Sequence, residues 1–262
     1  MILHNDKETF NDLIETTARV LRIPAVFIEK DYWVTYILNS LSKSPYKQTA
    51  IFKGGTSLSK AYKIIDRFSE DIDLAIITNG IDGNAVKSLI KSIEKALLDE
   101  NFEEKNTPQT SKGSKFRKTV HHYPKIIDGN FGHANENLIL ELNSFTKPHP
   151  YINKTISSYI FDFLNTQSEE SKKLIADFEL EPFEINVLDY KRTFCEKISA
   201  VARASFESDE VHSQLKEKIR HFYDIYHLMQ EEEIKAFLNS DDIDSMIQNV
   251  REDDQNSLIL IG

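Results

Sequence analysis

The amino-acid sequence predicts an α/β fold that ends in a mainly helical C-terminal part. Short apolar runs such as 50–52 and 74–77 have the length of strands, whereas 6–21 and 84–98 repeat apolar residues at the spacing of amphipathic helices. These two kinds of segment alternate along the chain, which is typical of an α/β protein.

Prolines mark where several of the predicted elements begin or end. Pro24 occupies the favoured first position of a second helix, and Pro148 and Pro150 interrupt the later pattern. The predicted domain boundary therefore separates 1–148 from 149–262. We expect helices over 6–21, 24–43, 58–65, 84–98, 190–206 and 218–228, strands over 50–52, 71–77, 116–123, 137–145 and 183–188, and a mostly helical segment with a short strand over 151–165.

Composition limits the class of protein. The chain has 262 residues, of which 40% are hydrophobic, enough for one large domain or two small ones. No apolar run approaches the ~20 residues of a membrane span, and the polar N-terminus lacks the pattern of a signal peptide. The single cysteine, Cys195, excludes an intramolecular disulfide and is expected in the core. These features predict a cytoplasmic protein. Zinc-type spacing and a P-loop motif are both missing from the sequence.

The charge is acidic overall but unevenly distributed. A net charge of −10 argues against a large nucleic-acid-binding face. The segment 105–125 nevertheless carries six basic residues and no acid: Lys105, Lys112, Lys115, Arg117, Lys118 and Lys125. Such a segment could hold a polyanionic substrate or form a basic hairpin that faces water, and the sequence leaves both open.

The stretch 51–77 carries the most chemical information. Gly54 and Gly55 end a short strand and allow a tight turn with a close backbone approach to a ligand. Thr56 and Ser57 can cap the helix that follows, and a helix N-terminus favours phosphate. The sequence therefore predicts a phosphate-binding turn here.

Two acidic residues open the next strand. Asp71 and Asp73 are two positions apart, so their side chains project from the same face of the strand, beside the glycine turn. Adjacent carboxylates repel each other, and Mg²⁺ commonly binds such a pair together with substrate phosphates. A surface strand with two solvated acids is the alternative, but the neighbouring glycine turn favours the metal site.

Two further charged residues interrupt apolar segments. Glu141 lies in the apolar strand 137–145, where a carboxylate is costly unless it is paired or binds a metal; an outward-facing position is the alternative. Lys197 lies near the middle of the otherwise apolar helix 190–206, which makes it a candidate for gripping a triphosphate. Arg203 lies on roughly the same stripe of that helix and is a second candidate.

The string KGGTSLSKAY at 53–62, followed by RFSEDIDL at 67–74, resembles the signature of AbiEii/AbiGii toxin-type nucleotidyltransferases, which include the MenT toxins. These belong to the DNA polymerase β-like nucleotidyltransferase superfamily, so the resemblance implies a core with a small mixed sheet and a helical part that closes the cleft. EKDYW at 29–33 resembles another segment of this branch. There, Lys30 and Asp31 could face the cleft, but we expect a solvated helix face.

The resemblance also implies roles for individual residues. Glu141 matches a third metal-binding carboxylate, and Lys197 matches a lysine that serves the nucleotide. Asp224, in the string YDIYHL at 223–228, matches a functional aspartate; physically it could orient Lys197 or Arg203 through a salt bridge. Plausible supports for the nucleotide are Lys53, Arg67 and Ser69.

The implied function is transfer of a nucleoside monophosphate from an NTP to an acceptor. Asp71, Asp73 and Glu141 would hold two Mg²⁺ ions, as in two-metal phosphoryl displacement. The acceptor implied by the resemblance is the 3′ end of a tRNA, and the protein would be the toxin that a cognate antitoxin neutralises. Transfer to a protein or a small molecule such as an aminoglycoside is the enzymatic alternative, and a catalytically silent NTP-binding module is the non-enzymatic one.

Overall fold

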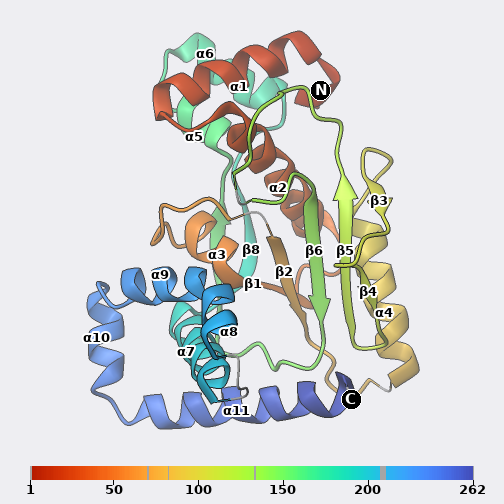
Figure 1. The fold of residues 1–262 in the computed structure, drawn as a ribbon. Coiled ribbons are helices and arrows are strands. Elements are labelled where there is room, and N and C mark those ends of the chain that lie inside the picture. Colours follow the sequence, from red (N-terminus) through yellow and green to blue (C-terminus); the bar gives the residue numbers. More distant parts are fainter. Residues whose placement is uncertain (1, 70, 82, 133, 207–210, 262) are drawn as a thin grey trace.

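A mixed sheet forms the centre of the molecule in the computed structural model, which describes residues 2–69, 71–81, 83–132, 134–206 and 211–261 (Figure 1). Within these ranges eight strands pair in the order β3-β5-β6-β2-β1-β8-β7, and β4 pairs with β5 outside this path. The strands are β1 (Ala50–Lys53), β2 (Asp71–Ile76), β3 (Glu103–Lys105), β4 (Ser111–Lys112), β5 (Phe116–His122), β6 (Leu138–Asn143), β7 (Tyr151–Ile156) and β8 (Phe183–Leu188).

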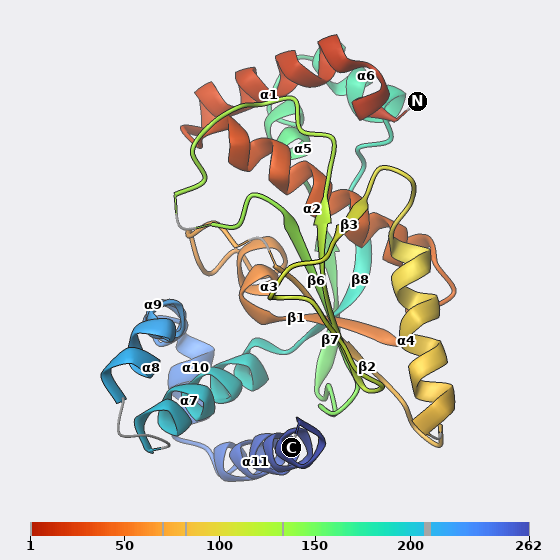
Figure 2. The ribbon, with the colours of Figure 1, turned by 45° about the vertical axis from the view of Figure 1, so that its right-hand side comes forward.

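Helices cover the sheet and extend the molecule at both ends (Figures 1 and 2). They are the short 3-10 helix η1 (Leu3–Asn5) and the α-helices α1 (Lys7–Leu21), α2 (Ala25–Lys43), α3 (Gly54–Lys60), α4 (Gly83–Leu97), α5 (Tyr159–Leu164), α6 (Glu169–Asp177), α7 (Tyr190–Phe206), α8 (Val211–Glu217), α9 (Ile219–Leu228), α10 (Glu232–Leu238) and α11 (Asp242–Ile261). The predicted α/β class is confirmed. The segment 151–165 consists of β7 and α5, as a short strand with a helix.

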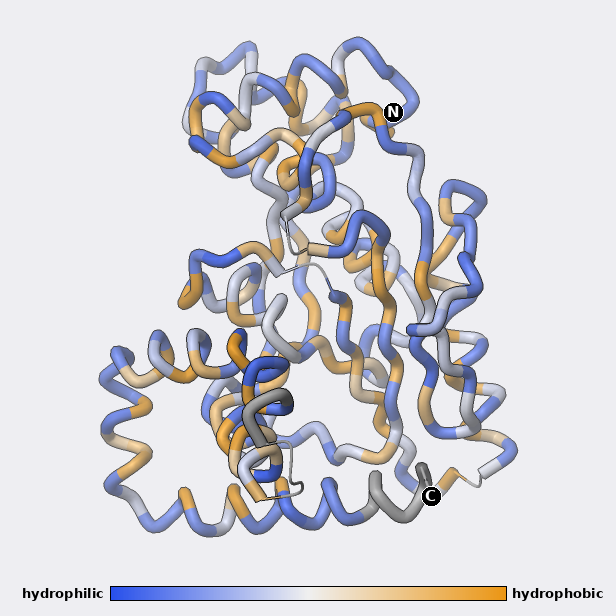
Figure 3. The backbone as a smooth tube through the Cα atoms, viewed as in Figure 1, coloured by the Kyte–Doolittle hydropathy of each residue, from blue (hydrophilic) through white to orange (hydrophobic). Residues whose placement is uncertain are grey.

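The two faces of the central strands differ in chemistry. Strand β2 pairs antiparallel with β1 and parallel with β6. Its residues Ile72, Leu74 and Ile76 are buried and belong to the main hydrophobic core, which also includes residues of α2 and α4. Figure 3 shows the hydrophobic character of these central strands. Because side chains alternate along a strand, Asp71 and Asp73 project from the opposite face.

A second hydrophobic core holds the C-terminal helices together. It contains Phe194 and Cys195 of α7, Leu228 of α9 and Val250 of α11, and it also takes in Leu58 of α3. The expected core position of Cys195 is thus confirmed. How the chain divides into folding units stays a prediction. Strands β7 and β8 follow the expected boundary at 148 but belong to the same sheet as β1, so the helical part begins only with α7.

The charged segment of α2 differs from expectation. Lys30 is fully buried and Asp31 is 4% exposed, so the solvated helix face predicted for them is wrong. Asp31 accepts a hydrogen bond from Lys60 Nζ at 2.5 Å and one from the Tyr159 backbone N–H at 2.9 Å. Asp31 therefore ties α2 to α3 and α5, and its burial is tolerated because both carboxylate oxygens are bonded.

Among the helices that the structure describes, none combines the length and the apolar character needed to cross a bilayer.

Candidate active site

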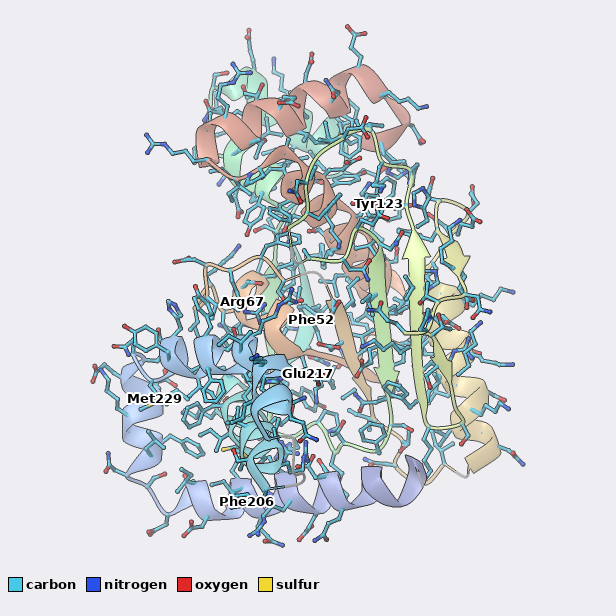
Figure 4. All side chains as sticks on the ribbon, viewed as in Figure 1. Phe52, Arg67, Tyr123, Phe206, Glu217 and Met229 are labelled. Carbon is cyan, nitrogen blue, oxygen red and sulfur yellow. The ribbon has the colours of Figure 1, made fainter. Side chains whose placement is uncertain are left out.

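A cleft of about 450 Å³ separates the Asp71–Asp73 face of the sheet from the C-terminal helices. Arg67 from the loop between α3 and β2 and Glu217 from α8, both labelled in Figure 4, are among the residues that line it. The cleft is also lined by most of the residues selected from the sequence: Lys53, Gly54, Gly55, Ser69, Asp71, Asp73, Glu141, Lys197, Arg203 and Asp224. Their roles in catalysis stay predictions.

A row of four charges crosses the sheet at the bottom of this cleft. Strand register places Lys53 of β1 opposite Asp73, Asp73 opposite Glu141, and Glu141 opposite Lys118 of β5. Side chains at paired positions project from the same face, so two carboxylates lie between two lysines. Glu141 forms an ion pair with Lys118 at 3.4 Å. The sequence identified the two acids and Lys53, but not Lys118, because strand order decides that neighbour.

The carboxylates in this row repel one another. Burial raises the pKa of the Asp73 carboxyl well above its ordinary value, and the charges of Glu141 and Asp71 raise it further. No group of three or more His, Cys, Asp or Glu side chains converges as a ready-made metal cage in the described part of the chain. The donor set nevertheless suits a hard divalent cation, since three carboxylates face one cleft and a cation would offset their repulsion.

The two glycines make room for two charged side chains of the cleft. Gly54 has a φ of +78°, and a Cβ at this position would lie 2.0 Å from Asp73 Oδ2. At Gly55 a Cβ would lie 2.5 Å from Arg67 Nη2. Glycine is therefore required here because the Asp73 carboxylate and the Arg67 guanidinium lie directly over the turn. The sequence predicted a close approach to a ligand; the structure shows a close approach to two protein side chains.

Thr56 and Ser57 lie inside α3, which spans Gly54–Lys60 and has Lys53 as its N-cap, so the prediction that they cap a helix over 58–65 is wrong. The helix begins earlier because the two glycines form its first turn, and Thr56 and Ser57 support that turn from inside the protein. Both side chains are fully buried. The Thr56 hydroxyl donates to the Asp71 carbonyl at 2.5 Å and also bonds Ser69 Oγ at 2.9 Å. Ser57 Oγ donates to the Gly54 carbonyl at 2.9 Å. Neither hydroxyl lines the cleft, so their direct contact with phosphate could come only from backbone N–H groups.

Asp224 holds two cations at the other wall. Its side chain is fully buried. One carboxylate oxygen accepts Arg67 Nε and the other accepts Arg67 Nη2, each at 2.7 Å, and the second also pairs with Lys197 Nζ at 2.7 Å. Burial alone would raise the pKa of the Asp224 carboxyl, but these bonds lower it below its ordinary value. The expected ion pair between Asp224 and Lys197 is present. The other cation that Asp224 binds is Arg67, not Arg203.

Arg203 lies elsewhere on the cleft wall. It forms an ion pair with Asp254 of α11 and its side chain is 38% exposed. The sequence proposed it as a partner of Asp224, but about 1.7 turns of helix separate it from Lys197. Arg203 therefore lies at the cleft edge rather than beside Asp224.

A second buried network was not predicted from the sequence. Glu196 pairs with Lys53 at 2.8 Å and with Arg192 at 3.4 Å, and Arg192 pairs with Asp253 of α11 at 2.6 Å. Burial acts to lower the pKa of Lys53, but the Glu196 carboxylate outweighs it and raises that pKa. The only sequence signal was a pair of opposite charges four residues apart in a largely apolar helix.

A glycine turn beside paired carboxylates, faced by buried cations, suits metal-dependent transfer of nucleotidyl or phosphoryl groups. The model of the family described as nucleotidyl transferase AbiEii toxin, type IV toxin–antitoxin system, matches residues 36–262. The chain belongs to this family of nucleotidyltransferases.

Two solved structures from Helicobacter pylori match the chain at low identity. One, provisionally described as a nucleotidyltransferase, is 13% identical with a TM-score of 0.36 and covers 88% of this chain and 95% of its own. The other, JHP933, is 13% identical with a TM-score of 0.35 and covers 89% of this chain and 93% of its own. Both TM-scores lie below 0.5, so the family assignment rests on the sequence match. A search of curated protein sequences gave no significant match.

Proposed function

We propose that the protein moves a nucleoside monophosphate from an NTP to the 3′ end of a tRNA in a Mg²⁺-dependent reaction. The observation that carries the proposal is the row Lys53–Asp73–Glu141–Lys118, with Asp71 on the same face of β2. In this row the acids face one another across neighbouring strands, and the cations stand only at its ends.

Asp71, Asp73 and Glu141 are the residues that would hold the metal. Two Mg²⁺ ions bound there would neutralise charge on the triphosphate and lower the pKa of the acceptor hydroxyl. The register supports this set, because it brings Glu141 directly beside Asp73. Lys118 now neutralises Glu141, and metal binding would release that lysine.

The opposite wall would hold the triphosphate. Lys197 and Arg67 share one buried carboxylate, so two cations carry a single compensating charge. The excess positive charge is available to phosphate oxygens, and the planar guanidinium suits bidentate binding. Asp224 positions both groups without touching the substrate itself.

Transfer is then an in-line displacement. The acceptor oxygen bonds to the α-phosphorus, and the bond from that phosphorus to the bridging oxygen breaks. Pyrophosphate leaves, and the hydroxyl proton passes to a cleft carboxylate. Family membership implies a toxin with an antitoxin partner; modification of tRNA would block translation, and the antitoxin would prevent or reverse the effect.

A transfer assay tests the proposal. The protein is incubated with each α-³²P-labelled NTP, Mg²⁺ and total tRNA, with an Asp71→Ala variant as control. We expect label on tRNA with the wild type only. Label on protein would keep the chemistry and replace the acceptor. Absence of all label and of pyrophosphate release, with NTP binding intact, would contradict transfer and favour a silent NTP-binding module.

A further inference from the structure

A second cavity of about 700 Å³ adjoins the catalytic cleft. It lies where β2 and β6 end, on the side away from the glycine turn, and Phe145 and Thr146 line both spaces. The two cavities therefore share a wall. Ile76, the last residue of β2, lines the second cavity and follows Asp73 by three residues, so the two sites are about 10 Å apart at ~3.3 Å per residue.

The lining of this second cavity is cationic. Its basic side chains are Lys115, Lys147 and His149, and no carboxylate of the residues that the structure describes lines it. That is unusual for a chain with a net charge of −10. Neither lysine forms an ion pair with a carboxylate of the described residues, whereas the lysines of the catalytic cleft are paired. The positive charge here is therefore available to a ligand.

Hydrogen bonds fix the segment that forms the wall between the two cavities. Ser144 donates from its backbone N–H and its hydroxyl to the Lys115 carbonyl, at 2.9 and 3.0 Å. The Lys147 backbone N–H donates to Asp253 Oδ2 at 2.9 Å, and Asp253 is only 3% exposed. The same carboxylate binds Arg192, which is part of the network that reaches Lys53. The cavity is thus built on the network that supports the catalytic cleft.

The cavity offers more than charge. Tyr151 is 37% exposed and lines it together with Phe145. Flat aromatic side chains beside lysines are the combination that binds single-stranded nucleic acid, because bases stack on rings while cations contact phosphates. Thr78 and Asn79 add hydrogen-bonding groups.

We propose that this cavity holds the nucleotides that precede the acceptor hydroxyl of a nucleic-acid strand, while the terminal hydroxyl reaches the catalytic cleft past Phe145 and Thr146. The inference rests on the proposed nucleotidyl transfer and assigns a place in the fold to the strand that carries the acceptor hydroxyl. A small acceptor would leave the second cavity unused, and a polycationic one such as an aminoglycoside would be repelled by its lysines. The basic segment 105–125 contributes Lys115, so its polyanion-binding interpretation is favoured for that residue.

Binding of a single strand tests this assignment without requiring turnover. The probe is a fluorescently labelled RNA of ten nucleotides with a free 3′ hydroxyl, followed by anisotropy from 50 to 300 mM salt. The test variant is Lys115→Ala/Lys147→Ala. The matched control is Lys91→Ala/Lys95→Ala, which removes two exposed lysines of α4 that line neither cavity.

The test variant should bind the RNA about tenfold or more weakly, because two charge-assisted contacts are lost. The slope of log Kd against log salt should fall by about 1.4, from about 0.7 for each phosphate contact on a single strand. The control should match the wild type, Lys115→Arg/Lys147→Arg should restore binding, and NTP affinity should not change in any variant.

Equal RNA affinity in the test variant and the control would overturn the inference, as would failure of the wild type to bind the strand. The proposed function fails in a different way, through loss of NTP-dependent pyrophosphate release in the wild type. A protein that releases pyrophosphate and labels another acceptor, without binding RNA, would keep the transferase activity and refute the polynucleotide cavity.

Discussion

Asp224→Asn is the substitution that most sharply tests how the cleft is held together. The Asp224 carboxylate is fully buried and accepts two bonds from Arg67 and one from Lys197, all at 2.7 Å. Asparagine has nearly the same shape but no charge, and its NH₂ group would face a cation. The variant therefore leaves a guanidinium and an ammonium side by side without their shared counter-ion.

The size of the expected loss in stability follows from the burial of the three charged side chains. Removing one partner of a buried ion pair costs about 3–5 kcal/mol. Arg67 and Lys197 are 18% and 8% exposed, so water reaches them only in part and restores little of the loss. We expect the free energy of unfolding to fall by about 3 kcal/mol or more, a large share of the roughly 5–15 kcal/mol that stabilises a typical protein.

The effect depends on pH in a defined direction. Because the pKa of Asp224 lies below its ordinary value of 3.8, its charge stabilises the fold above that pH. This contribution is lost as pH falls from 3.8 through the lower pKa of the folded state. The difference in stability between the wild type and Asp224→Asn should therefore be full near pH 7 and shrink below pH 4.

Urea denaturation of the wild type and Asp224→Asn measures the difference in their free energies of unfolding. NTP titration measures the loss of triphosphate affinity. Asp162→Asn is the matched control, since Asp162 pairs with Lys63 at 3.3 Å with side chains that are 36% and 52% exposed. Such a surface pair contributes at most about 1 kcal/mol. If Asp224→Asn destabilised the protein no more than Asp162→Asn, the buried carboxylate would not organise this wall.

Three further predictions concern the same cleft. Asp73→Asn should abolish transfer while thermal unfolding stays within a few degrees of the wild type or rises, because the change removes a repelled buried charge; residual turnover within tenfold would exclude Asp73 as a metal ligand. Gly54→Ala should remove activity because its Cβ would lie 2.0 Å from Asp73 Oδ2, whereas Gly83→Ala, with no atom within 4 Å, should be nearly silent in the transfer assay. Burial, together with Lys197 and Lys218, lowers the pKa of His221 from 6.5 to about 4, so the unfolded state binds a proton first and stability should fall as pH drops from 6.5 to 4. His221→Gln should flatten that part of the curve, and an unchanged pH profile would show that His221 is not responsible.

The sequence predicted what depends on local spacing. Asp71 and Asp73 share a face because strand residues alternate, and the glycine turn precedes them because the pattern changes there from strand to helix. The position of Glu141 beside Asp73 was implied by family resemblance, and the parallel register of β2 and β6 places it there. Local pattern and family resemblance together located one wall of the cleft.

The sequence could not predict pairings that only the folded chain creates. Arg67 and Asp224 are 157 positions apart, and no periodicity links them. Charged residues in a helix are usually exposed to solvent, so the sequence did not predict the burial of Lys30 and Asp31. Their burial depends on partners from other elements, which only the folded chain brings close. The hydroxyls of Thr56 and Ser57 suited a ligand site equally well on residue type, and only the structure shows them bonded inward.

The measurement that most directly tests the central claim is the count of divalent ions bound by the cleft. Mn²⁺, used in place of Mg²⁺, can be followed by its paramagnetic resonance signal in the presence of a non-hydrolysable NTP analogue. The account predicts two bound ions per chain for the wild type and a lower number for Asp73→Asn, with both proteins folded. Equal Mn²⁺ binding by the two proteins, or none by the wild type, would contradict the assignment of these carboxylates to a metal centre.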